Sequence, residues 1–121
     1  ALRFAFCEKE VELNRLTATG IVLGTPEFMS PEQIRGRTID QRSDIYALAV
    51  LAFELLTGRL PFDGANAQET MLNHLTGKPR RLRDVVPSLP DWLDRAIEKA
   101  LRLDPADRYA SMTEFAEALR P

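Results

Sequence analysis

One apolar segment constrains the fold of this chain more than any other feature. Residues 43–57, which precede Gly58, carry apolar side chains at most positions, so a helix formed from them is apolar on every face. Such a helix is stable only where other protein surrounds it. The segment also contains Tyr46 and Glu54 and is shorter than the roughly 20 residues that span a bilayer. It therefore predicts a buried core helix.

Further helices are expected where capping signals meet apolar periodicity. The capping boxes pair an accepting side chain with an acidic or amide residue three positions later: Ser30 with Gln33, Asn66 with Glu69, and Ser111 with Glu114. The corresponding stop signals are Gly36, Gly77 with Pro79, and, for an amphipathic helix over residues 92–103, Pro105. That amphipathic helix is expected to expose Asp94, and the last helix to turn Met112, Phe115, Ala116 and Leu119 inward. Strand signals are limited to residues 2–6 and 20–23. The sequence thus predicts a mainly α fold.

Composition and charge exclude several classes of protein. The chain has 121 residues and a net charge of −2, so no general attraction to nucleic acid is expected. The basic cluster of Lys78, Arg80, Arg81 and Arg83 is interpreted as a solvated loop. Cys7 and His74 are the only residues of their types, so neither a disulfide nor a metal site is expected. A lone thiol favours a reducing, cytoplasmic location. Ala1 replaces an initiator methionine, which indicates a processed, excised or incomplete chain.

Four motifs follow one another in the order in which one enzyme family carries them. Residues 24–32 (GTPEFMSPE) resemble the end of a protein-kinase activation segment, and residues 43–49 resemble the start of the family's central helix. Residues 55–62 are similar to the exit from that helix, and residues 103–109 resemble the loop before the last helix. Over roughly residues 14–121 the chain therefore resembles bacterial-type serine/threonine protein kinases.

The resemblance implies a domain organisation as well as a fold. It implies the helical C-terminal-lobe portion of the protein kinase-like fold, from the activation segment to the last helix. Residues 14–32 would form the activation segment and substrate loop, and residues 33–121 the helical scaffold. Residues 1–13 remain unassigned, as a leader or as a degenerate magnesium-loop region.

The resemblance also implies roles for individual residues. The implied substrate-binding loop consists of Gly24, Thr25, Pro26, Glu27 and Phe28, and Thr17 and Thr19 are implied sites of regulatory phosphorylation. Glu32 and Arg108 are expected to form a buried ion pair, although without the family Glu32 would only complement a helix N-terminus and Arg108 would be a surface residue. Asp44 is interpreted as a helix cap or first-turn acid. In the complete kinase it would also hold the catalytic loop.

The parts of a kinase that act on ATP are not found in the sequence. A glycine-rich loop, a strand lysine, a His-Arg-Asp catalytic loop and a magnesium-binding Asp-Phe-Gly are all missing. Arg3 stands where an alignment of residues 3–7 would place the magnesium-binding aspartate, and a cation cannot coordinate magnesium. ATP and magnesium are therefore expected to serve the complete kinase and not to bind this chain, for which no catalytic residue is predicted.

Three interpretations stay open. The chain is a fragment of an active kinase that phosphorylates protein serine and threonine, or a non-catalytic pseudokinase scaffold, which Arg3 favours. An unrelated helical interaction module would show repeats near 34 residues, and none occurs. The expected partners are a protein substrate and the upstream kinase lobe, with a membrane tether of the complete protein left open. Core-helix residues such as Leu48 and Phe53, left in water, would make the isolated chain self-associate.

Overall fold

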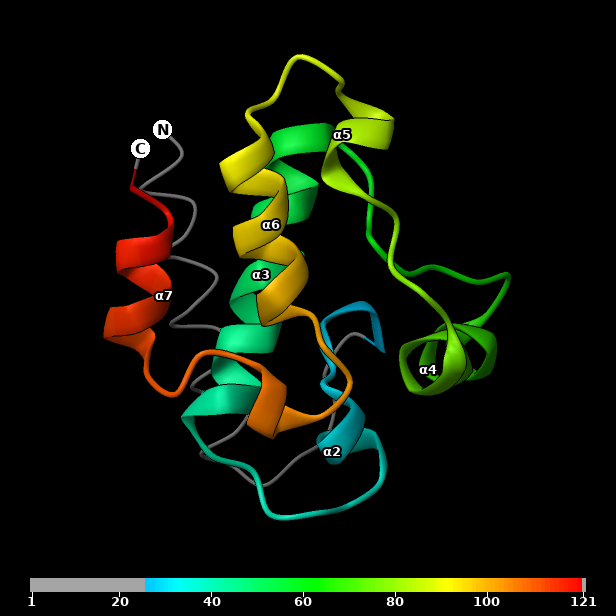
Figure 1. Ribbon diagram of the computed structural model, residues 1–121. Helices are drawn as coiled ribbons and strands as arrows, with labels where there is room; N and C mark the ends of the chain where they lie inside the picture. The colour runs from blue at the N-terminus through cyan, green and yellow to red at the C-terminus, as the bar shows by residue number, and fades with distance from the viewer. Residues whose placement is uncertain (1–25, 121) are drawn as a thin grey trace.

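The computed structural model describes residues 26–120, which form helices joined by loops (Figure 1). In chain order these are η1 (Pro26–Phe28), α2 (Pro31–Ile34), α3 (Gln41–Thr57), α4 (Ala67–Thr76), α5 (Leu82–Val85), α6 (Asp91–Ala100), η2 (Pro105–Asp107) and α7 (Met112–Ala118). Residues 26–120 contain no strand, which confirms the mainly helical expectation for this part of the chain. The two segments with strand signals lie outside the described residues.

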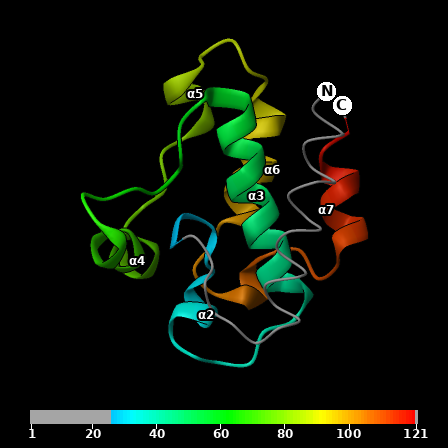
Figure 2. The ribbon, with the colours of Figure 1, turned by 180° about the vertical axis from the view of Figure 1, so that it is seen from behind.

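Helix α3 is the centre of the fold. It runs between α6 and α7 on one side and α4 on the other, and α2 lies near its N-terminal end (Figures 1 and 2). Contacts with η1, α5, α6 and α7 bury most of its circumference. Phe53 is fully buried and Leu48 is partly buried against the core, so the expectation that these residues remain in water is wrong. Leu55 alone among the large apolar residues of α3 is exposed, at 38%.

The ends of α2 and α3 are set by local hydrogen bonds. The N–H of Ser30 donates to Gln33 Oε1 at 2.9 Å, and the N–H of Gln33 donates to Ser30 Oγ at 3.3 Å, which completes the expected capping box. Helix α3 begins at Gln41, earlier than the expected residue 43, because Asp40 Oδ1 accepts the N–H of Arg42 at 2.9 Å. Gly58 ends α3 with φ +73°, a left-handed conformation that glycine adopts readily.

The second half of the chain differs from expectation at four places. Helix α6 ends at Ala100 instead of residue 103. Asp94, expected on its exposed face, is 5% exposed because it accepts hydrogen bonds from Arg81 and from the N–H of Leu82. Those bonds and the burial of Leu82 support the short helix α5, which was not expected and which includes Arg83, whereas Lys78, Arg80 and Arg81 lie in a loop, as expected of the basic cluster. In α7, Phe115 is buried as expected, but Ala116 is exposed.

Candidate functional site

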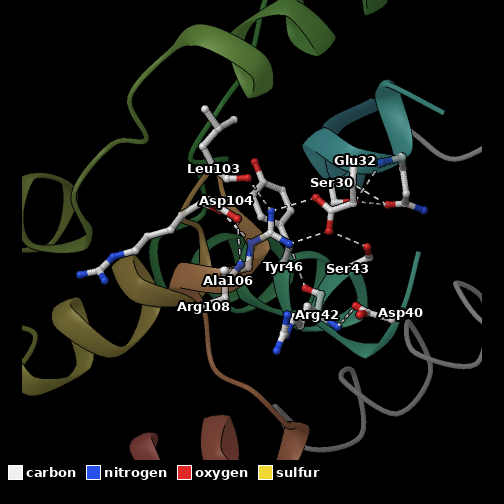
Figure 3. A network of polar contacts seen from close by, with 12 residues as sticks. Ser30, Glu32, Asp40, Arg42, Ser43, Tyr46, Leu103, Asp104, Ala106 and Arg108 are labelled. Atoms are coloured by element: carbon white, nitrogen blue, oxygen red, sulfur yellow. Dashed lines mark hydrogen bonds and ion pairs between the residues drawn. The ribbon is translucent and has the colours of Figure 1, made fainter. Parts of the chain in front are cut away.

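Glu32 and Arg108, which are far apart in the sequence, form a buried ion pair (Figure 3). Arg108 Nη1 donates to Glu32 Oε2 at 2.7 Å, and Nη2 donates to Oε1 at 2.9 Å. The two parallel bonds form the bidentate geometry that guanidinium and carboxylate groups favour. The side chain of Arg108 is 0% exposed and that of Glu32 is 7% exposed. The pair therefore joins α2 to the loop after η2 from inside the protein.

Every donor direction of the Arg108 guanidinium is used. Besides Glu32, the group donates to three backbone carbonyls: Nε to Arg102 at 2.7 Å, Nη1 to Arg42 at 3.1 Å and Nη2 to Leu103 at 3.2 Å. These bonds account for the five N–H groups of an arginine side chain. The guanidinium carbon also lies 4.8 Å from the centre of the Tyr46 ring. A buried charge held in this way avoids the desolvation cost of an unpaired ion.

Glu32 is held in its charged form by its partners. Burial alone would raise the pKa of this carboxyl group, but hydrogen bonds from Arg108 and from Ser43 outweigh burial and lower the pKa below 4.5. The Ser43 hydroxyl donates to Glu32 Oε2 at 2.6 Å. Because Ser43 belongs to α3, this bond fixes α2 directly to the core helix. One carboxylate thus joins three segments: α2, α3 and the loop after η2.

The ion pair stabilises the end of the predicted substrate-binding loop. Pro26, Glu27 and Phe28 form η1, are partly buried, and pack against α3 and α4. Met29 and Ser30, which connect η1 to α2, are buried at 7% and 0% exposure. The loop therefore enters the fold at a rigid point. Its first residues, Gly24 and Thr25, lie outside the described residues, as do Thr17 and Thr19.

A second buried polar contact joins α3 and α4, the two helices against which η1 packs. Tyr46 Oη of α3 and His74 Nδ1 of α4 are 2.6 Å apart. The two side chains are 0% and 2% exposed, and the ring of Phe62 lies 4.7 Å from that of His74. Burial lowers the pKa of His74 to about 4, although the backbone of Glu27 and Pro26 partly opposes this effect. The imidazole is therefore neutral near pH 7.

Asp44 takes the position expected for a first-turn acid. It is exposed in the first turn of α3, where a carboxylate complements the helix dipole, while Asp40 provides the N-cap. Its implied role in holding a catalytic loop stays a prediction.

Sequence reasoning passed over three residues of this site. Ser43 and Tyr46 were included only as parts of the core helix, and His74 was considered unremarkable. Their polar groups become significant only because distant segments meet them. One pattern is consistent with the burial of His74: the residue lies one helical turn after Thr70, and both are buried on α4.

The described part of the chain offers no site for a metal ion. Within residues 26–120, no three His, Cys, Asp or Glu side chains gather so that they could hold one. None of the helices described is long and apolar enough to cross a membrane.

Comparisons with known proteins identify the family. Residues 5–119 match the protein kinase domain family. The chain is 44% identical over 104 residues to the serine/threonine-protein kinase Pkn1 of Myxococcus xanthus, covering 86% of this chain and 15% of that protein. It is 45% identical to PknF of Mycobacterium tuberculosis, covering 86% and 22%, and 45% identical to PrkC of Bacillus subtilis, covering 83% and 15%. The chain thus spans well under a third of the length of these relatives.

A solved structure is similar in fold as well. The twitchin kinase region from C. elegans matches 78% of this chain and 17% of its own, with a TM-score of 0.72 and 28% sequence identity. The match to the family over residues 5–119, together with the bacterial relatives, shows that this chain belongs to the protein kinase domain family.

Proposed function

We propose that this chain supplies the activation segment, the substrate-binding loop and the supporting helices of a serine/threonine protein kinase. The complete enzyme would transfer the γ-phosphoryl group of ATP to serine or threonine hydroxyls of a protein substrate. The observation that carries the proposal is the buried Glu32–Arg108 pair, which fixes α2 to the core directly after the predicted substrate loop. The similarity to three bacterial serine/threonine kinases supports it.

A fixed loop suits the chemistry of phosphoryl transfer. Protein kinases contribute mainly positioning and electrostatic stabilisation, because the transferred group needs little covalent help from the protein. A loop with a rigid end holds an acceptor hydroxyl in line with the phosphate and lowers the entropic part of the barrier. In this proposal residues 24–28 hold the substrate, and α2 and α3 keep that loop in position.

ATP and magnesium belong to the complete kinase in this proposal. The described residues do not fit a magnesium ion, since no cluster of carboxylates lies among them. We therefore assign no step through the nucleotide or the metal to this chain. The upstream lobe is the partner that would supply both sites.

Regulation is proposed at Thr17 and Thr19. Phosphorylation would add about −1.5 to −2 charges at each site and order the activation segment through contacts with arginines. Both residues precede the substrate loop by a few positions, so ordering them would also restrain the loop.

A pseudokinase scaffold is the second candidate function. Arg3, in the position that the magnesium-binding aspartate would take, favours it. The coding sequence upstream of Ala1 separates the two candidates. An in-frame His-Arg-Asp and Asp-Phe-Gly would support the enzyme, and their absence would support the scaffold.

The test uses the complete polypeptide that contains these residues. It is incubated with γ-labelled ATP, magnesium and a protein substrate, and the product is hydrolysed to its phosphoamino acids. We expect phosphoserine and phosphothreonine without phosphotyrosine. A Thr25→Ala variant should lower kcat/KM roughly tenfold or more, about 1.4 kcal/mol of transition-state stabilisation. Thr113→Ala, at an exposed position of α7, is the matched control. Absence of transfer, or transfer to tyrosine, would contradict the proposal.

A further inference from the structure

His74 carries a buried polar atom whose purpose the fold alone does not explain. The residue is 2% exposed, and among the described residues Nε2 has no hydrogen-bond partner. A buried nitrogen without a partner loses its hydrogen bonds to water and gains none in return, which destabilises the fold. Leucine or phenylalanine would fill the same space beside Phe62 without that cost. The imidazole is therefore present for the bonds that its nitrogens make.

The surroundings of the ring determine which nitrogen carries the proton. The hydroxyl of Tyr46 stays protonated, because burial raises its pKa, and its hydrogen needs an acceptor. Nδ1, 2.6 Å away, is that acceptor only if Nδ1 itself is unprotonated. The proton of the neutral ring then resides on Nε2. The backbone of Glu27 and Pro26 lies near the ring, since it partly opposes the lowering of the His74 pKa, and η1, to which both residues belong, packs against α4.

His74 therefore lies between three elements of the site. Its own helix is α4, Tyr46 belongs to α3, and Glu27 and Pro26 belong to η1, which packs against both helices. The guanidinium carbon of Arg108 also lies 4.8 Å from the centre of the Tyr46 ring. Tyr46 thus connects the histidine to the Glu32–Arg108 pair. The side chain of Tyr46 thus contacts both His74 and the Glu32–Arg108 pair, the two features that support the loop.

We propose that His74 is a positioning residue that holds the substrate-binding loop, its Nε2–H donating to the backbone carbonyls of η1 when the loop engages a protein substrate. This inference rests on the proposed function and deepens it. The neutral ring accepts from Tyr46 and donates to η1, so it fixes the distance between α3, α4 and the loop. Loss of the donor loosens the loop without touching the nucleotide site.

Two substitutions separate the roles of the two nitrogens. The amide of asparagine lies as many bonds from Cβ as Nδ1 does, so His74→Asn can keep the contact with Tyr46 and loses the donor to η1. The amide of glutamine extends one bond further, so His74→Gln can keep the donor and loses the contact with Tyr46. Tyr46→Phe is the matched variant that removes the hydroxyl alone.

The variants are made in the complete kinase, and kcat and both KM values are measured. We expect His74→Asn to raise KM for the protein substrate roughly tenfold, about 1.4 kcal/mol, with KM for ATP unchanged. His74→Gln should remain within a few-fold of wild type. Equal behaviour of the two variants, or a matching rise in KM for ATP, would overturn the inference. Thermal melts identify a variant that does not fold.

A second measurement does not depend on any variant. The chain contains one histidine, so its imidazole nitrogens are assigned without ambiguity in a ¹⁵N-labelled sample of the 121-residue chain. We expect Nε2 to resonate as a protonated nitrogen and Nδ1 as an unprotonated one, because Nδ1 accepts from Tyr46. A protonated Nδ1 would overturn the inference. A complete kinase without activity would reject the proposed function, and the spectrum would still decide the tautomer of His74.

Discussion

Replacement of Glu32 or Arg108 should reveal one strongly coupled pair. Each single substitution leaves the other charge buried, at 0% exposure for Arg108 and 7% for Glu32. Breaking such a pair from one side typically costs about 3–5 kcal/mol. Arg108→Ala should be the more severe change, because it also leaves the carbonyls of Arg102, Leu103 and Arg42 without their donor. After Glu32→Ala, by contrast, the guanidinium keeps all three carbonyls.

The double substitution should cost less than the sum of the two single ones. We expect a coupling of about 2–3 kcal/mol, since the second substitution removes the charge that the first one stranded. Unfolding is followed in urea, because guanidinium would screen the pair, and Trp92 is the only tryptophan to report it. If the alanine variants do not fold, Glu32→Gln and Arg108→Lys retain most of the volume and complete the cycle.

A surface pair provides the matched control. Asp91 and Arg95 lie one turn apart on α6 with a closest contact of 3.0 Å, and their side chains are 57% and 71% exposed. Exposed pairs of this kind couple by about 0.3–0.5 kcal/mol. A coupling for Glu32 and Arg108 no larger than that of the control would refute the reasoning.

Two further predictions concern pH and association. The pKa of His74 is lowered from 6.5 to about 4 in the folded protein. Between pH 6.5 and 4.5 the unfolded state therefore binds more protons than the folded state. The free energy of unfolding should fall by about 2–3 kcal/mol as the pH falls through that window. His74→Gln should remove this decline in urea titrations, whereas Glu32 contributes a loss only below pH 4.5, as its lowered pKa requires. The isolated chain exposes Leu72 at 55% and Leu55 at 38%, and we expect sedimentation to detect self-association or a hydrophobic dye to bind. A monomer with a sharp melt and no dye binding would contradict this expectation.

Local signals made the helix ends predictable. The Ser30–Gln33 box and the stop at Gly58 depend on residues within one turn, so the sequence alone specifies them. Helix α3 was recognisable because its apolar side chains face every direction. Asp40 as the N-cap was missed because the apolar segment starts after it.

Long-range contacts explain what the sequence could not predict. Arg81, which precedes the short helix α5, pairs with Asp94 in α6, and the burial of Asp94 depends on that same contact, so neither segment signals it alone. The Glu32–Arg108 pair was expected only through the resemblance, because residues so far apart carry no local pattern. The contact between Tyr46 and His74 had no such resemblance to indicate it. It is visible only once α3 and α4 are packed around η1.

Calorimetric titration with ATP and magnesium tests most directly whether the nucleotide and magnesium sites of the proposed kinase lie outside this chain. The 121-residue chain is titrated beside the complete polypeptide that contains it, under identical conditions. We predict magnesium-dependent binding to the complete polypeptide and no heat of binding with the chain alone, since its sequence contains none of the motifs with which kinases contact phosphate and magnesium. Micromolar, magnesium-dependent binding of ATP to the isolated chain would contradict the assignment of these residues to the protein-substrate side of the kinase.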